Sequence, residues 1–131
     1  MISFNEYIGW YGDAMPDACQ YVSFDIKFEK PVIVSEFGAD ALYGFHGDSL
    51  TRWSEEYQEN VYIQQLAMLR RHAKVRGITP WLLVDFRSPR RNAPFYQDGW
   101  NRKGVYSELG DKKRAFYVLK RFYEEVEKGF K

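Results

Sequence analysis

Two patterns of apolar positions divide the 131-residue chain into alternating elements. Residues 2–10, 32–37 and 81–86 are short runs rich in β-branched, leucine and aromatic side chains, and each run predicts a strand. Between and after these runs, apolar residues return every three or four positions, which predicts helices with one buried stripe. The strand–helix order repeats along the chain, so the pattern predicts an α/β domain with parallel strands joined by helical crossovers.

Proline, serine and glycine mark the ends of the predicted helices. Pro16 suits the first turn of the first helix, and Pro31 closes that helix. Ser54 is the expected N-cap of the second helix and Gly77 its C-terminal stop, while Asp111 is expected to cap the last helix. The residues expected on the three buried stripes are Ala18, Val22 and Ile26; Tyr62, Leu66, Leu69 and Ala73; and Ala115, Leu119, Phe122 and Val126.

The two long loops of this arrangement, 38–53 and 87–104, follow predicted strands. Glu36 comes at the end of the second strand, just before a glycine, and Asp85 comes near the end of the third. Because the carboxyl ends of parallel strands meet at one edge, both carboxylates are expected on the same face as the loops. A Glu36 that is solvated, or that pairs with a nearby arginine, is the alternative interpretation.

Composition narrows the classes of function. The net charge is +1, so no broad electrostatic attraction to nucleic acid or to a membrane is expected. Aromatic residues make up 18% of the chain, which suits an aromatic core and also a cleft that stacks sugar rings. The single cysteine, Cys19, has no partners at metal-ligand spacing, and we expect neither a metal nor a cofactor. No signal peptide or transmembrane run is recognisable, which is compatible with a cytoplasmic location and leaves the location open.

Four motifs follow one another along the chain: FNEYIGWY at 4–11, PVIVSEFG at 31–38, WSEEYQ at 53–58 and NRKG at 101–104. Together they resemble the C-terminal part of the catalytic barrel in family 2 glycoside hydrolases, the β-glucuronidase and β-galactosidase group. The resemblance covers essentially the whole chain. It implies a partial (β/α)8 TIM barrel, in which residues 1–131 supply three parallel βα units that correspond to strands 6–8.

The resemblance also implies roles for individual side chains. Glu36 matches the catalytic nucleophile, and Tyr7 matches the tyrosine that hydrogen-bonds and orients this carboxylate. Trp81 resembles the tryptophan that floors the sugar site, and Asn101 and Lys103 match an Asn-x-Lys pair that grips the substrate carboxylate in β-glucuronidases. Because related galactosidases can carry a similar tetrapeptide, a β-glucuronide and a β-galactoside are both candidate substrates.

Asp40 and His46 fall in the first long loop, and we expect them to line the rim of the sugar site. Simpler interpretations stay open for several positions. Tyr7 can be a core aromatic, and Trp81 is expected to be buried in any version of its strand. The Asn-x-Lys pair lies in a polar loop, where such residues are common without a specific role.

One group that the chemistry needs is missing from the matching motifs. A retaining glycosidase uses a nucleophile and, about 5 Å away, a second carboxyl that acts as acid and then as base. In this family the second carboxyl follows an Asn at the end of the fourth strand, ahead of the motifs found here. Asn5-Glu6 has that dipeptide, but the Tyr7-Ile8-Gly9-Trp10 that follows identifies its segment with the sixth strand. The chain is therefore expected to carry one of the two catalytic carboxyls.

The sequence thus favours a catalytic-domain fragment of a retaining β-glycosidase, which hydrolyses the O-glycosidic bond of a β-linked sugar together with the rest of its barrel. On its own, the chain is expected to be inactive or nearly so. A non-catalytic carbohydrate-binding module derived from such a barrel is the alternative. A flavodoxin-like domain is disfavoured, because no Gly-rich phosphate loop follows the first strand.

A partial barrel also predicts self-association. Three strands leave two sheet edges bare, and the apolar side chains expected on the open face are Val32, Val34, Leu82 and Val84. Exposed apolar surface of this kind drives association. The isolated chain is therefore expected to be a homo-oligomer, with a symmetric dimer as the first candidate.

Overall fold

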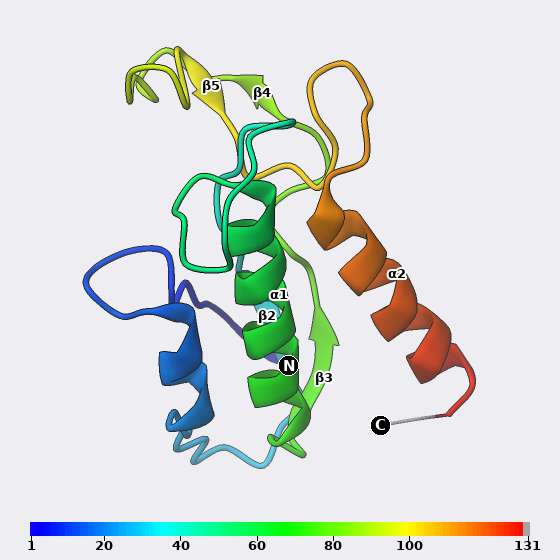
Figure 1. Ribbon diagram of the computed structural model, residues 1–131. Helices are drawn as coiled ribbons and strands as arrows, with labels where there is room; N and C mark the ends of the chain where they lie inside the picture. Colours follow the sequence, from blue (N-terminus) through cyan, green and yellow to red (C-terminus); the bar gives the residue numbers. More distant parts are fainter. Residues whose placement is uncertain (130–131) are drawn as a thin grey trace.

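The computed structural model describes residues 1–129, in which helices cover one face of a small parallel sheet (Figure 1). The sheet has three strands in the order β1-β2-β3, with bounds Ile2–Asn5, Val32–Glu36 and Val75–Ile78. The other elements are the 3-10 helix η1 (Pro16–Gln20), the helices α1 (Glu55–Arg70) and α2 (Arg114–Glu127), and the short antiparallel strands β4 (Phe86–Arg87) and β5 (Trp100–Asn101). The predicted α/β class with parallel strands is confirmed, whereas several element boundaries differ.

The third strand comprises residues 75–78 and not the predicted run 81–86. α1 ends at Arg70, so Gly77 is not a helix stop; it lies within β3 and pairs with Ile33 of β2. A Cβ at Gly77 would lie 3.4 Å from the Ile33 side chain, which is ordinary van der Waals contact. The apolar run 81–86 follows the strand mainly as a loop. The apolar pattern predicted the third strand at 81–86 because this segment is apolar, whereas β3 itself is short and carries an arginine and a glycine.

The N-terminal segment is less regular than predicted. β1 ends at Asn5, well before Trp10, and η1 is a single short 3-10 helix. Val22 and Ile26 therefore do not continue a helical stripe. Val22, Phe24 and Ile26 are instead half-buried between exposed neighbours, which is the two-residue alternation of an extended chain. Val22 and Phe24 pack against the main core. The alternation of apolar and polar residues in VSFDIK therefore indicated an extended segment rather than a helix.

The main core lies between the sheet and α1, with α2 packed beside α1 (Figure 1). Val32 and Val34 of β2 are buried on this helix-covered face, where Val34 clusters with Tyr62 of α1. The strand residues that alternate with them, on the opposite face of β1 and β2, are Ser3, Asn5, Ile33 and Ser35. The expectation that Val32 and Val34 form an uncovered apolar face is therefore wrong, and Leu82 and Val84 lie outside the sheet. β1 and β3 remain its edges, and self-association through them stays a prediction.

The two long helices begin in different ways. Ser54 caps α1 as predicted, because its hydroxyl accepts a hydrogen bond from a backbone N–H of the first turn at 3.0 Å. Lys113 precedes α2 without a side-chain cap, and the Asp111 carboxylate instead accepts a hydrogen bond from a serine hydroxyl at 3.0 Å. The prediction that Asp111 caps α2 is wrong. The predicted stripes also end early, because Ala73 lies beyond α1 and Val126 is 48% exposed.

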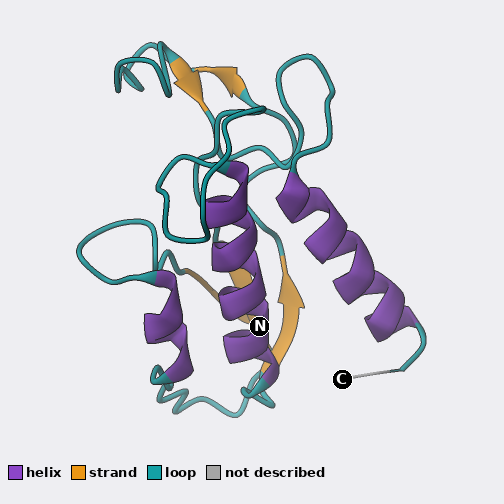
Figure 2. Ribbon diagram, viewed as in Figure 1, coloured by secondary structure: helices purple, strands orange, loops and turns teal. Residues whose placement is uncertain are grey.

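The long loops gather at one end of the molecule, beyond the carboxyl ends of the parallel strands (Figure 2). This is the edge at which the sequence places Glu36, and the loops that surround it are residues 38–54 and 79–113. Within residues 1–129, no helix combines the length and the apolar character needed to cross a membrane. In the same part of the chain, no group of three or more His, Cys, Asp or Glu side chains is arranged to hold a metal ion.

Candidate active site

The carboxylate of Glu36 stands at the end of β2 with the phenol of Tyr7 against it. Asn5 pairs with Glu36 between the strands, and the Glu6 N–H donates to the Glu36 carbonyl at 2.8 Å, which fixes the two strand ends side by side. The Tyr7 hydroxyl donates to Glu36 Oε2 at 2.8 Å. Burial first, and then this hydrogen bond, raise the pKa of Tyr7 far above its ordinary value, so the phenol keeps its proton and remains a donor. The hydrogen bond that the family resemblance implies is present.

The backbone just after Glu36 contacts Trp81, which follows β3, so Trp81 lies at the same strand end. The Trp81 N–H donates to the Phe37 carbonyl at 2.9 Å. Gly38 has a φ of +150°, and a Cβ there would lie 2.6 Å from the Trp81 carbonyl oxygen, so a glycine is required. The Trp81 side chain is 37% exposed, contrary to the expectation of burial, because it follows β3 in a loop. Part of its surface is therefore left uncovered by the described residues.

Gly38→Ala is expected to lower the free energy of unfolding by about 3 kcal/mol, because the backbone conformation and the overlap with Trp81 both oppose a side chain. Gly110→Ala is the matched control. Gly110 also has a positive φ, of 88°, but nothing lies within 4 Å of its added Cβ. The control should lose only about 1 kcal/mol. Urea denaturation measures both losses, and equal losses would show that the close approach to Trp81 is unimportant.

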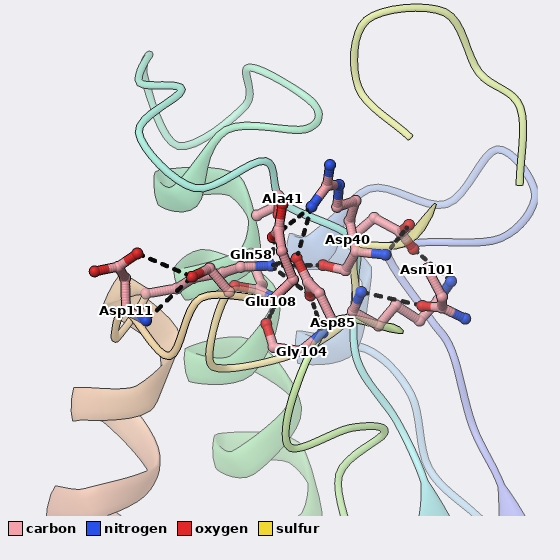
Figure 3. A network of polar contacts seen from close by, with 12 residues as sticks. Asp40, Ala41, Gln58, Asp85, Asn101, Gly104, Glu108 and Asp111 are labelled. Carbon is pink, nitrogen blue, oxygen red and sulfur yellow. Dashed lines mark hydrogen bonds and ion pairs between the residues drawn. The ribbon is translucent and has the colours of Figure 1, made fainter. Parts of the chain in front are cut away.

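A buried ion pair joins the two long loops (Figure 3). Lys103 is 1% exposed and Asp40 is fully buried, and the Lys103 ammonium donates to Asp40 Oδ1. The second Asp40 oxygen accepts from Gln97 Nε2 at 2.9 Å and from the Arg102 N–H at 3.1 Å. Asn101 Oδ1 accepts from the Lys103 N–H at 3.1 Å. The prediction that Asp40 lines the rim is therefore wrong, because Asp40 is the buried partner of Lys103.

His46 is set apart from the other predicted site residues. Its exposed ring lies at the start of α1, where Nδ1 is 2.8 Å from Glu56 Oε1. The second Glu56 oxygen accepts from the Gly47 N–H at 3.2 Å, so Glu56 holds this turn against the helix. Among the described residues, no hydrogen bond or ion pair connects His46 with Glu36 or Lys103. Its place at a substrate rim stays a prediction.

Two aromatic residues that sequence reasoning did not select connect the predicted groups. The Tyr11 ring lies 5.0 Å from the Tyr7 ring, in an edge-on arrangement. The Lys103 ammonium lies 5.1 Å from the Tyr11 ring centroid and 5.4 Å from that of Trp10. Tyr11 therefore stands between the Tyr7–Glu36 pair and the Asn-x-Lys motif. The sequence feature that could have identified Trp10 and Tyr11 as site residues is their position inside the FNEYIGWY motif.

Asp85 was expected at the open face, but the structure buries it against Lys113 (Figure 3). The Lys113 ammonium donates to both Asp85 oxygens at 2.8 and 2.9 Å, and to the carbonyls of Ala41 at 2.6 Å and Arg102 at 2.9 Å. The Gly104 N–H also donates to Asp85, at 2.8 Å. Burial raises the pKa of Asp85 to about 6 in spite of Lys113. This pair ties together the loops that carry Asp40 and Lys103.

Among the described residues, no hydrogen bond or ion pair joins the side chains of Glu6 and Glu36. Glu6 Oε1 accepts from the Ile8 N–H, and Gln65 Nε2 of α1 donates to the Ile8 carbonyl at 2.7 Å. Glu6 is 6% exposed, and burial raises its pKa. The interpretation that Asn5-Glu6 is not the acid/base dipeptide stays a prediction.

A carboxylate at the end of a parallel strand, with long loops around it, is an arrangement that α/β barrels use at the carboxyl ends of their strands. The family described as "Glycosyl hydrolases family 2, TIM barrel domain" matches residues 1–127. The chain therefore belongs to this family.

Individual relatives agree with this assignment. The chain is 31% identical to a β-glucuronidase of Paenibacillus borealis, over 96% of this chain and 22% of the relative. It is 32% identical to the β-glucuronidase of Sus scrofa, over 94% of this chain and 20% of the relative. The chain thus spans about a fifth of the length of the curated relatives it matches.

Solved structures give the same result. The β-glucuronidase of Faecalibacterium prausnitzii superposes with a TM-score of 0.79 at 28% identity, covering 95% of this chain and 21% of that one. A family 2 β-galacturonidase from Eisenbergiella tayi, bound to galacturonate, has a TM-score of 0.77 at 27% identity and covers 95% of this chain and 23% of that one.

Proposed function

We propose that the chain is the C-terminal part of the catalytic barrel of a retaining β-glycosidase, with β1, β2 and β3 as strands six, seven and eight. The observation that carries this proposal is the 2.8 Å hydrogen bond from Tyr7 to Glu36 at the end of a parallel strand, in a chain of family 2. The substrate that we propose is a β-linked uronide. The names of the relatives support it, since they are β-glucuronidases and a β-galacturonidase.

In this mechanism Glu36 is the nucleophile. Its carboxylate forms a bond to the anomeric carbon as the bond from that carbon to the leaving oxygen breaks. A second carboxyl, contributed by a strand of the barrel outside this chain, protonates the leaving oxygen and later deprotonates the water that releases the sugar. Tyr7 donates to Oε2 and so stabilises the ionised nucleophile, which leaves Oε1 as the attacking atom. Trp81 offers its exposed ring to the sugar.

Lys103 and Asn101 are the proposed ligands of the substrate carboxylate. The Lys103 ammonium has two further N–H groups besides the one directed at Asp40. Asn101 uses its Oδ1 to accept from the Lys103 backbone, and within residues 1–129 its amide NH₂ makes no hydrogen bond. Asp40 holds the ammonium, and Gln97 in turn donates to the second Asp40 oxygen. The hydrogen bond from the Lys103 N–H fixes the Asn101 amide. Both donors lie in one loop, and because Lys103 is 1% and Asn101 4% exposed, a substrate carboxylate that reaches them requires this loop to shift.

Lys103→Gln in the full-length enzyme that contains this chain is expected to lower kcat/KM for 4-nitrophenyl β-D-glucuronide by about 10- to 100-fold, since a hydrogen bond to a charged group is lost. The loss of kcat/KM on 4-nitrophenyl β-D-galactoside should be far smaller, because that sugar has no carboxylate. The ratio of the two values is the readout, since it cancels any change in the folded fraction caused by the unpaired Asp40. Asn101→Ala is the second variant. Equal losses on both substrates would mean that this loop has a structural role.

A further inference from the structure

The Lys103–Asp40 ion pair lies between two loops whose backbones are held on both sides of it. Gln58, a fully buried residue of α1, donates through Nε2 to the carbonyl of Ala39 at 2.8 Å and to that of Gly104 at 3.1 Å (Figure 3). Ala39 precedes Asp40 in the first loop, and Gly104 follows Lys103 in the second. One amide group therefore fixes a chain neighbour of each ion-pair partner.

Lys113 makes the same kind of attachment from the start of α2. Its ammonium donates to the carbonyl of Ala41 at 2.6 Å and to that of Arg102 at 2.9 Å. These two residues are the other chain neighbours of the ion pair, one in each loop. The Ala41 N–H also donates to the Arg102 carbonyl at 3.0 Å, so the loops are bonded directly as well. Gln58 and Lys113 thus hold all four residues that flank the ion pair, each through a backbone carbonyl.

These attachments fix the backbone of the second loop and not its side chains. Lys103 and Asn101 are buried, so a substrate carboxylate reaches them only when part of this loop moves. Because Gln58 and Lys113 bond to the carbonyls on either side of Lys103, these bonds can persist while side chains move. The point from which the Lys103 ammonium reaches a carboxylate is therefore set by these two residues.

The hydrogen bonding of Gln58 favours a role in alignment over one in stability alone. Both N–H groups of its amide are directed at carbonyls, whereas its buried Oε1 has no hydrogen-bond partner within residues 1–129. A buried oxygen without a partner costs free energy, which offsets part of what the two hydrogen bonds contribute. The main effect of Gln58 is therefore to align the two loops.

We propose that Gln58 and Lys113, which we call the loop clamp, are positioning residues for the substrate carboxylate. They act through Lys103, because they fix the backbone on both sides of it and so set where its ammonium meets the carboxylate. The inference rests on the proposed function and adds residues that determine the preference for a uronide over a neutral sugar. A displacement of about 1 Å is enough to cost about 100-fold in rate, so the loss of half of the clamp has a measurable effect.

Gln58→Met, in the full-length enzyme that contains this chain, removes half of the loop clamp and keeps the length of the side chain. It should lower kcat/KM for 4-nitrophenyl β-D-glucuronide by about 10-fold and leave kcat/KM for 4-nitrophenyl β-D-galactoside nearly unchanged, because only the glucuronide has a carboxylate. The loss should appear mainly as a higher KM, since a contact made in the bound substrate is weakened. Gln58→Asn, whose amide is too short to reach both carbonyls, is the second variant and should show the same change.

Gln65→Met is the matched control. Gln65 lies about two turns further along α1, is also fully buried, and has an Oε1 without a partner among the described residues. Its Nε2 donates to the Ile8 carbonyl at 2.7 Å, outside the two loops of the clamp. Loss of this bond should affect both substrates alike, so the ratio of the two kcat/KM values should stay at that of the wild type.

The outcomes separate the loop clamp from the proposed function. Equal losses on both substrates in the Gln58 variants, or a ratio that falls as far in Gln65→Met, would mean that Gln58 only supports the fold and would overturn the clamp. A ratio that falls in Lys103→Gln but not in the Gln58 variants also overturns the clamp and leaves the proposed function intact. A wild type that hydrolyses neither substrate overturns both. A ratio that falls in Lys103→Gln and in both Gln58 variants, but not in Gln65→Met, supports the inference.

Discussion

Glu36→Gln is expected to lower the kcat of the full-length enzyme on 4-nitrophenyl β-D-glucuronide by more than about 10⁴-fold, because the nucleophile is removed. The amide keeps the size of the side chain, and its oxygen can still accept the hydrogen bond from Tyr7. It cannot form a glycosyl ester. Steady-state kinetics measure kcat for the variant, and its circular dichroism spectrum should match that of the wild type, which shows that it is folded.

The matched control is Glu124→Gln, the same chemical change on α2, where Glu124 forms an exposed pair with Lys120 at 3.6 Å. The control should keep wild-type activity. Substantial turnover by Glu36→Gln would remove Glu36 from the mechanism. A wild type that binds the sugar with no turnover, and keeps that binding in Glu36→Gln, would instead favour the non-catalytic carbohydrate-binding module.

Replacing the fully buried Lys113 is expected to have the second large effect, a fall in the free energy of unfolding. Lys113→Ala removes the ammonium that bonds to both Asp85 oxygens and to two backbone carbonyls. Because the Asp85 carboxylate is left buried without its main partner, the free energy of unfolding should fall by about 3–5 kcal/mol at pH 8. Lys120→Ala is the control, since its exposed i,i+4 pair with Glu124 is worth less than about 0.5 kcal/mol. Urea denaturation of the protein measures both.

The loss in Lys113→Ala should depend on pH. Burial raises the pKa of Asp85 to about 6 with Lys113 present, and removing Lys113 raises it further. A carboxyl with a folded pKa above its unfolded value adds stability while it is protonated, and that contribution is lost as the pH rises through the folded pKa. The penalty in the variant should therefore shrink between pH 8 and pH 5. A penalty that is the same at both values would mean that Asp85 is not the group left unpaired.

The sequence could predict the strand end that carries Glu36 because a continuous β-branched run specifies it. Residues 32–36 form a central strand, buried on the helix side and paired on both edges. β3 escaped prediction because its VRGI sequence is short, and its place is set by tertiary pairing of Gly77 with Ile33. Likewise, nothing local in the run 81–86 distinguishes an apolar loop from a strand.

The candidate site shows a similar division. Motif order alone brought together Tyr7, Glu36 and Trp81, which the structure places at one strand end. The burial of Asp40 with Lys103 could not be predicted, because it depends on two loops that are 63 residues apart in sequence and meet only in the folded chain. The bridging position of Tyr11 depends on the turn after β1, which the expected long strand 2–10 concealed.

Covalent labelling tests most directly whether Glu36 is the nucleophile of a retaining enzyme. The full-length enzyme is treated with 2-deoxy-2-fluoro-β-D-glucuronyl fluoride, whose fluorine at C2 slows hydrolysis of the glycosyl ester, and its peptides are mapped by mass spectrometry. We expect one 2-fluoroglucuronyl group on the peptide that contains PVIVSEFG, attached to Glu36, with time-dependent loss of activity. A label on any other residue, or inactivation without a covalent adduct, would contradict the assignment.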